Sequence, residues 1–380
     1  MKLLYITLSI SLVCIPVTAD RPCAPREFGS GNIVCVCNMT YCDTIAKLSA
    51  VPADQFVQYS TSQSGLRFHK TVGSLVDSPH STGIRFTVNL TATYQRILGF
   101  GGAFTDAAGI NIDSLALQVK QNLMRSYFSV DGIEFNFGRV PVAGSDFSTH
   151  TYTYDDVPGD ANFTHYNLTL EDFFYKLMSD KQVAEYIDGI AVHWYWDTLF
   201  PPSLLDRTHN NFPDKFILAT EASVGDKPWE FEKVKLGSWS RGESYMEDIL
   251  EDLNHWVTGW IDWNLALNPQ GGPNWARNFV DAAIIVNTSA NEFYKQPMFY
   301  ALGHFAKFLP EGSVRIGLQP QEEKGVLAVA FQTPDNAVII ILYSRSDYDR
   351  RVTVTVSDTR HINLDIPKRS FHTVITGKVN

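Results

Sequence analysis

The middle of the chain repeats one pattern, in which an apolar run of strand length is followed by a stretch with the spacing of an amphipathic helix. Two such stretches, Leu117–Tyr127 and Glu243–Leu253, are predicted to be helices. The predicted strands are Phe135–Val142, Ile187–Tyr195, Lys215–Ala219 and Gly259–Asn264. Strands that alternate with helices form parallel sheets. The pattern therefore favours a (β/α)8 barrel, whose functional residues lie at the carboxyl ends of the strands.

One carboxylate stands where such a strand ends. Glu221 closes the apolar run that begins at Phe216, and segments rich in aromatic and amide side chains follow at 262–268 and 271–275. A carboxylate among aromatic and amide groups indicates a sugar-processing site. A retaining glycosidase needs two carboxylates, however, and this is the one well-placed candidate in the sequence. The alternative for Glu221 is a purely structural carboxylate at a strand end.

Both ends of the chain show a different pattern, in which apolar and polar residues alternate between turns rich in Gly and Ser. This alternation predicts antiparallel strands. The predicted strands are 67–70 and 83–88 near the N-terminus, and 325–331, 337–343, 351–356 and 370–375 near the C-terminus. We therefore expect a β-sandwich that is built from both termini and flanks the mixed middle of the chain.

Residues 1–19 have the form of a secretory signal peptide. Lys2 is followed by an apolar centre and by the small residues Val17–Ala19. The apolar run is too short to span a bilayer, so we expect the chain to enter the secretory pathway; the alternative is a retained signal anchor. The net charge is −10 and the sequence has no basic tract, which argues against nucleic acid as a partner.

Cysteines and glycosylation sequons agree with a secretory route. After the signal, four cysteines fall within twenty residues, and an even number in a secreted chain predicts two disulfides. Three pairings are open, and zinc is the alternative, although no His lies nearby. The cysteines are Cys23, Cys35, Cys37 and Cys42, and the sequons begin at Asn38, Asn89, Asn162, Asn167 and Asn287.

Several further blocks occur in a fixed order along the chain. They are Gly99–Ala108, Arg139–Pro141, Asp146–Ser148, Ala191–Tyr195, Asp262–Phe279 and Phe293–Tyr300. Together with the cysteine spacing, these blocks resemble glycoside hydrolase family 30, and within it the lysosomal acid β-glucosidases (glucosylceramidases). Any one block would be a weak signal, but this many in order is specific.

The resemblance implies an architecture of three parts. Segments 20–46 and 265–297 would form a small β-sheet region that carries the disulfides. Segments 47–95 and 313–380 would form an immunoglobulin-like β-sandwich. The catalytic (β/α)8-type barrel would comprise 96–264 and 298–312, with the disulfides pairing Cys23 with Cys35 and Cys37 with Cys42.

The resemblance also implies roles for single residues. Glu221 would be the nucleophile, and Tyr195 would lie beside it. Asp146, Trp263 and Asn278 would line the glucose pocket. The structural alternatives are that Asp146 caps a loop and that Trp263 is packed in the core. For Asp106 and Arg139 the structural alternative is an ion pair below the site. No metal or organic cofactor is implied.

By the same resemblance, the substrate is glucosylceramide, which is hydrolysed to glucose and ceramide in sphingolipid metabolism. The implied location is the lysosomal lumen, in association with the membrane. The implied partners are the glycosphingolipid and a saposin-type activator protein.

The chain departs from the family at one place. Between the Asp146 and Ala191 blocks the family has barrel strands three, four and five, but here the interval fits about one βα unit. Three missing units amount to roughly 100 residues, at ~30 or more per unit. The interruption is predicted near 176–178. We therefore expect a barrel that lacks about three βα units.

The acid/base residue is missing with those units. The family places this glutamate in an Asn-Glu-Pro motif on strand four, and the sequence contains no such motif. Its Asn291–Glu292 pair is followed by Phe293, and we expect Glu292 to be a solvated surface carboxylate. Activity of this form on glucosylceramide is therefore in doubt. The alternative is a catalytically inactive truncated isoform or gene model, a secretory protein without enzymatic function.

Overall fold

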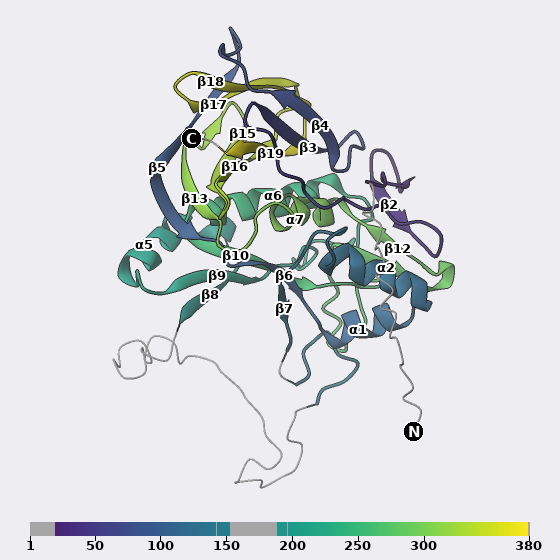
Figure 1. Ribbon diagram of the computed structural model, residues 1–380. Helices are drawn as coiled ribbons and strands as arrows, with labels where there is room; N and C mark the ends of the chain where they lie inside the picture. The colour runs from purple at the N-terminus through teal and green to yellow at the C-terminus, as the bar shows by residue number, and fades with distance from the viewer. Residues whose placement is uncertain (1–19, 142, 153–187, 196, 379–380) are drawn as a thin grey trace, which may run out of the picture.

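Three β-sheets, with two helices packed between the larger pair, form the fold (Figure 1). The computed structural model describes residues 20–141, 143–152, 188–195 and 197–378. The signal segment 1–19, the sequons Asn162 and Asn167, and the predicted interruption at 176–178 lie outside the described residues. No helix in the described part of the chain is long and apolar enough to cross a membrane.

The first sheet is parallel and has the order β7-β6-β10-β9-β8. Its strands are β6 (Gly99–Ala103), β7 (Phe137–Arg139), β8 (Gly189–His193), β9 (Phe216–Glu221) and β10 (Val257–Asn264). All four strands predicted in the middle of the chain belong to it. Within the described ranges β7 pairs with β6 and β8 with β9, and no ladder joins β7 to β8. Among the described residues the sheet is therefore open and has five strands, whereas a closed barrel of this type has eight.

β6 was not predicted as a strand because it is rich in glycine. The structure shows why glycine is needed there. A Cβ atom at Gly101 would lie 2.3 Å from the carbonyl oxygen of Phe137, and one at Gly259 would lie 2.1 Å from the carbonyl oxygen of Gly99. The backbones at the centre of this sheet thus approach more closely than any larger residue would permit.

Helices cover one face of the parallel sheet and its ends. They are α1 (Asp106–Asp113), α2 (Leu117–Phe128), α5 (Ser203–Asn211), α6 (Trp239–Asn254) and α7 (Pro297–Ala306), with short 3-10 turns η1 (Asp197–Leu199) and η2 (Thr288–Ala290). Helices α6 and α7 lie between the parallel sheet and the second sheet (Figure 1). The side chains of Tyr245, Ile249 and Leu253, spaced four residues apart, form a stripe of α6 that is fully buried.

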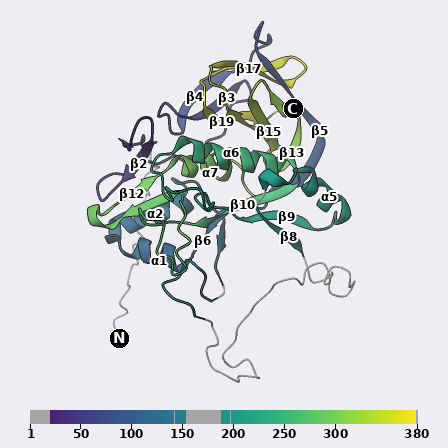
Figure 2. The same cartoon turned by 180° about the vertical axis from the view of Figure 1, so that it is seen from behind.

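The second sheet has ten strands and joins the two ends of the chain (Figure 2). Its main path is β18-β17-β5-β13-β15-β16-β19-β3-β4. The N-terminal strands are β3 (Gln55–Ser62), β4 (His69–Ser74) and β5 (Ile84–Arg96). The C-terminal strands are β13 (Val314–Gln319), β14 (Glu322–Glu323), β15 (Val326–Gln332), β16 (Ala337–Ser344), β17 (Arg350–Ser357), β18 (Arg360–Ile366) and β19 (Ser370–Lys378). The two termini are joined by the β3–β19, β5–β13 and β5–β17 pairings.

The third sheet is small and carries the disulfides. It has the order β1-β2-β12-β11, from β1 (Pro25–Glu27), β2 (Ile33–Cys37), β11 (Ile284–Asn287) and β12 (Glu292–Lys295). Cys23 is bonded to Cys35 and Cys37 to Cys42, the pairing that the resemblance implied. The two bonds join cysteines that are 12 and 5 residues apart in the sequence. This pairing fixes residues 23–42 against β12.

Candidate active site

Glu221 is the last residue of β9, at the carboxyl end of the parallel sheet. Its side chain is 15% exposed. Two groups hold the carboxylate: the Tyr195 hydroxyl donates to Oε1 at 2.8 Å, and Nη1 of Arg139 donates to Oε2. Tyr195 follows β8 and Arg139 ends β7, so side chains from three strands converge on one carboxylate. This convergence is possible because parallel strands present their carboxyl ends at the same edge.

Arg139 is the cation of this site. Its Nη1 also donates to the carbonyl oxygen of Thr220 at 3.1 Å, which fixes the guanidinium against the end of β9. The expected ion pair between Arg139 and Asp106 is wrong. The carboxylate of Asp106 instead accepts a hydrogen bond from the hydroxyl of Tyr152 at 2.9 Å. Arg139 therefore acts on Glu221 directly.

A second carboxylate lies among amides at the same edge of the sheet. Oδ2 of Asp146 accepts hydrogen bonds from Nδ2 of Asn278 at 3.1 Å and from Nδ2 of Asn274 at 3.2 Å. Asn274 also bonds the backbone of Asn278 in both directions, which orders the loop after β10. The structure thus brings Asp146 and Asn278 together. Asn274 was not identified from the sequence as a site residue, although it lies in the amide-rich segment 271–275.

Trp263 stands between these two groups. It is a buried residue of β10, and its ring centre lies 4.5 Å from the guanidinium carbon of Arg139. The ring of Phe147, the residue after Asp146, also meets Trp263 edge-on, with the ring centres 6.1 Å apart. The indole therefore connects the Glu221 group to the loop of Asp146, and it serves packing and the site at once.

Neither partner of Glu221 can take the place of a second catalytic acid. An arginine guanidinium does not lose its proton in proteins. Burial and the neighbouring charge of Glu221 raise the pKa of Tyr195 well above that of a free phenol, so its hydroxyl remains a hydrogen-bond donor to the carboxylate. The arrangement can hold a nucleophilic carboxylate in position, but it does not supply a proton to a leaving group.

Glu292 does not provide that acid either, and its predicted environment was wrong. We expected a solvated surface carboxylate, but Glu292 is buried in β12, with 7% of its surface exposed. It forms an ion pair with Arg26 and accepts a hydrogen bond from the hydroxyl of Tyr294 at 2.6 Å. It thus belongs to the small sheet, where its role is to tie β1 to β12.

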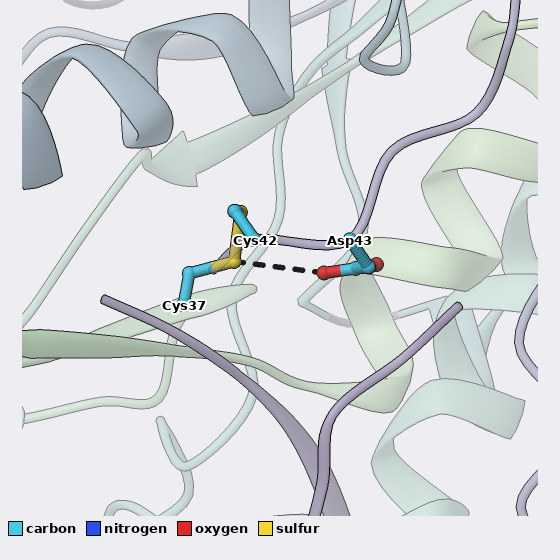
Figure 3. A group of neighbouring side chains, drawn as sticks. All are labelled: Cys37, Cys42 and Asp43. Carbon is cyan, nitrogen blue, oxygen red and sulfur yellow. Dashed lines mark hydrogen bonds between the residues drawn. A yellow bond between two sulfur atoms is a disulfide. The ribbon is translucent and has the colours of Figure 1, made fainter. Parts of the chain in front are cut away.

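One group among the described residues has the spacing of metal ligands, namely Cys37, Cys42 and Asp43 (Figure 3). The two sulfur atoms are bonded to each other at 2.03 Å, so neither is a thiolate that could bind a metal. Asp43 is already satisfied, because its carboxylate accepts from the Tyr300 hydroxyl at 2.6 Å and pairs with Lys295 at 3.0 Å. The group therefore does not fit a metal ion.

Solved structures share the fold. The crystal structure of SrfJ from Salmonella typhimurium superposes with a TM-score of 0.76 and 18% identity, covering 86% of this chain and 100% of that one. The endo-beta1,6-glucanase BT3312 superposes with a TM-score of 0.72, again at 18% identity over 86% of this chain and 100% of that one. At this identity the likeness extends to the fold alone.

Family profiles match the chain in two parts. The glycosyl hydrolase family 30 TIM-barrel domain matches residues 97–179 and 175–309, and the beta sandwich domain of the same family matches 312–374. The two barrel segments meet at 175–179, where the sequence predicted an interruption at 176–178. The barrel pattern is thus present on both sides of that point.

Curated relatives align almost end to end with this chain. Lysosomal acid glucosylceramidase of Mus musculus is 32% identical, with 93% of this chain and 95% of that protein covered. Putative glucosylceramidase 4 of Caenorhabditis elegans is 31% identical with the same coverage. The alignment with the mouse protein has 492 positions, but 93% of the 380 residues of this chain is only about 353 residues. About 139 positions of the alignment therefore have no residue of this chain. With both family domains matched and relatives aligned over nearly its whole length, the chain belongs to glycosyl hydrolase family 30.

Proposed function

We propose that this chain carries the nucleophilic half of a glucosylceramidase-type retaining β-glucosidase site, with Glu221 as the nucleophile. The observation that supports this most strongly is the convergence of Tyr195 and Arg139 on the Glu221 carboxylate at the end of β9. The relatives named above supply the substrate class, a β-glucoside of a sphingolipid, with glucosylceramide as the natural substrate. The site would work in the secretory pathway and the lysosome, at a membrane surface and with a saposin-type activator.

In the first step, formation of the glucosyl-enzyme, the described side chains would have different roles. Asp146 and its amide partners Asn274 and Asn278 would bind hydroxyl groups of the glucose ring. An oxygen of Glu221 would attack the anomeric carbon while the bond to the leaving oxygen breaks and its electron pair stays with that oxygen. Arg139 and Tyr195 would hold the carboxylate on the line of attack.

The missing acid limits this chemistry. A ceramide alkoxide is a poor leaving group, and general acid–base catalysis typically contributes ~10²–10⁴-fold. The second step, attack of water on the glucosyl-enzyme, also lacks its base. An aryl glucoside with a good leaving group needs no proton, so it should react with Glu221 when glucosylceramide does not.

Covalent labelling tests the proposal. A 2-fluoroglucoside with a dinitrophenolate leaving group should add one fluoroglucosyl group to the peptide that contains Glu221, detected by mass spectrometry. The Glu221→Gln variant should not be labelled, and the exposed control Glu232→Gln should be labelled like the parent chain. Azide should release glucosyl azide from an aryl glucoside. A label on another carboxylate with Glu221 untouched would disprove the assignment.

A second candidate function is supported by the open parallel sheet. Within the ranges that the structure describes, the sheet has five strands with edges at β7 and β8 and no closed frame, and this favours a non-catalytic secretory protein. The same experiment separates the two candidates. A folded chain that neither takes the label nor responds to azide would be non-catalytic.

A further inference from the structure

Three of the sequons lie among the described residues, and they share one local geometry. In each, the hydroxyl group of the third residue donates a hydrogen bond to Oδ1 of the asparagine: Thr40 to Asn38 at 3.0 Å, Thr91 to Asn89 at 2.7 Å and Ser289 to Asn287 at 3.0 Å. Such local bonds are typical of surface turns. The sites therefore differ in the surroundings of the amide nitrogen Nδ2, the atom to which a glycan is attached.

At Asn287 the amide nitrogen is already in use. Its Nδ2 donates to the hydroxyl oxygen of Tyr294 at 2.8 Å. The same hydroxyl group donates to Glu292 at 2.6 Å and accepts from Nη1 of Arg26 at 3.2 Å, so all of its hydrogen-bonding positions are filled. Tyr294 is only 3% exposed. A sugar on Nδ2 would stand against this buried side chain, and moving the amide away would take one donor from the Tyr294 hydroxyl.

At Asn89 the amide nitrogen is free. Side chains alternate along β5, so that Phe86 is buried in the sheet while Arg85, Thr87 and Asn89 are exposed on the opposite face. Among the described residues only Oδ1 of Asn89 is hydrogen-bonded, to the backbone N–H and the hydroxyl group of Thr91. A sugar on Nδ2 would leave both of these bonds in place.

The strand around Asn89 has a neighbour on one side only. The ladder that joins β5 to β17 ends at the pair Thr87–Thr355. From Val88 onwards, within the described ranges, the ladders of β5 join it to β13 alone. This part of β5 runs along the outer flank of the large sheet (Figure 1). An unpaired side of a strand can take up a strand of another chain, unless something bulky occupies the space beside it.

We propose that Asn89 carries an N-linked glycan, which covers the unpaired side of β5, and that Asn287 is unmodified in the folded chain. In the transfer, a bond forms between Nδ2 and the anomeric carbon of the first sugar of a lipid-pyrophosphate-linked oligosaccharide. The bond from that carbon to the phosphate oxygen breaks, its electron pair stays with the phosphate, and one amide proton is released. The proposal needs the predicted secretory route, but it does not depend on the reaction proposed at Glu221.

The folded structure selects between the two sites after the transfer. A chain modified at Asn287 has to form the small sheet without an undisturbed bond to Tyr294, whereas a chain modified at Asn89 keeps every hydrogen bond of that residue. Folded and secreted protein should therefore contain the Asn89 glycan and lack one at Asn287.

Peptide mapping of the full chain, secreted from a eukaryotic host, tests the occupancy. Digestion with a peptide N-glycosidase in heavy-oxygen water converts each glycosylated asparagine to a heavy aspartate, which mass spectrometry detects. We expect this mark at Asn89 and its absence at Asn287. Thr91→Ala, which destroys the sequon, should lose the mark at Asn89, and Thr91→Ser, which keeps the sequon, should retain it. An unmarked Asn89 in the parent chain, or an Asn287 marked to the same extent, would overturn the proposal.

Sedimentation velocity tests the covering role. Removal of the glycan from the folded parent chain by an endoglycosidase should raise the weight-average sedimentation coefficient at micromolar concentration, because chains then associate along β5. Thr91→Ala should show the same rise relative to Thr91→Ser, and Ser289→Ala should sediment as the parent does. The open parallel sheet is common to all samples, so the difference reports on β5. Equal sedimentation with and without the glycan would overturn the covering role. Labelling of Glu221 is measured separately, so either proposal can fail alone.

Discussion

At the scale of single residues, the candidate site depends on contacts between side chains that are far apart in the sequence. Arg139 lies 82 positions before Glu221, and its guanidinium contacts the Glu221 carboxylate, the carbonyl oxygen of Thr220 and the face of Trp263. A planar cation with several donors can make these contacts together, which a lysine ammonium cannot. Arg139 therefore couples the Glu221 carboxylate to the ring of Trp263.

Replacing Arg139 with glutamine should slow covalent labelling at Glu221. We expect the rate constant for reaction with the dinitrophenyl 2-fluoroglucoside to fall by about 10²-fold, the usual loss when a reacting group is misplaced by about 1 Å. The measurement is a time course of labelled protein by mass spectrometry. Arg207→Gln, on the exposed face of α5, is the matched control and should label at the parent rate. An Arg139 variant as fast as this control would exclude the positioning role.

The sequence predicted which residues gather at this site. It did not predict which of them form hydrogen bonds with one another. A strand-end carboxylate identified Glu221, and the family blocks identified Tyr195, Asp146, Trp263 and Asn278. Their hydrogen bonds could not be predicted, because register and loop conformation decide which polar atoms meet. The same reason explains two errors: Arg139 pairs with Glu221 and not with Asp106, and Glu292 is buried beside Arg26.

At the scale of elements, the ten-stranded sheet carries a buried titratable group in the pairing of β19 with β3, which joins the two ends of the chain. His372 on β19 lies opposite Ser60 on β3, and its ring contacts Gln58 at 3.0 Å, Ser60 at 2.9 Å and Ser370 at 2.7 Å. Burial lowers the pKa of His372 to about 3. The neutral imidazole is therefore part of the joint between the two ends of the chain.

This histidine should make the sheet sensitive to acid. The unfolded chain takes up a proton at a pKa of about 6.5 and the folded one does not, so stability contributed by His372 is complete above that value and is lost as the pH falls towards about 3. Between pH 7 and pH 5 the loss is about 2 kcal/mol, at 1.36 kcal/mol per unit.

Urea unfolding at pH 7 and at pH 5 measures this loss of folding stability. The stability difference between the parent chain and His372→Asn should shrink by about that amount at pH 5. The exposed His69→Asn on β4 serves as the control, for which the difference should stay constant. A His372 difference independent of pH would show that the folded chain takes up a proton at this ring as readily as the unfolded chain does.

Element types were predictable where the residue pattern was strong. The sequence predicted the four strands in the middle of the chain and the helices α2 and α6. Burial of a strand, or of one face of a helix, gives the apolar residues a spacing that can be recognised in the sequence. β6 was missed since its glycines, required by close backbone approach, carry no apolar signal. The strand order of the large sheet, with parallel β5 and β17 side by side, is set by long-range pairing that no local pattern contains.

At the scale of the whole molecule, the missing βα units leave the parallel sheet with two edges, in the described part of the chain, at β7 and β8. Edge strands present unpaired backbone groups that can pair with another chain. Apolar side chains near these edges are exposed, including Val140 at 64% and Phe216 at 37%. We therefore expect the chain to associate through these edges.

A lysine on the edge should reduce this association. Ala191 is an exposed residue of β8, and Ala191→Lys places a charge on the open edge. Sedimentation velocity should show the parent chain forming oligomers at micromolar concentration, and the variant shifted towards monomer. Val72→Lys, on the outer strand β4 of the large sheet, is the matched control and should behave as the parent does. A monomeric parent chain would contradict the prediction.

The pairing of β3 with β19 has a consequence for the order of events during synthesis. β3 is among the first strands to leave the ribosome, and its partner β19 is made last. At about 5–20 residues per second, the roughly 310 residues between them take about 15–60 s to translate. During that interval the disulfide region before β3 can already form its bonds, and β3 can pair with β4 but lacks its other partner, β19. Chaperone binding to the nascent chain should therefore concentrate on residues 55–62.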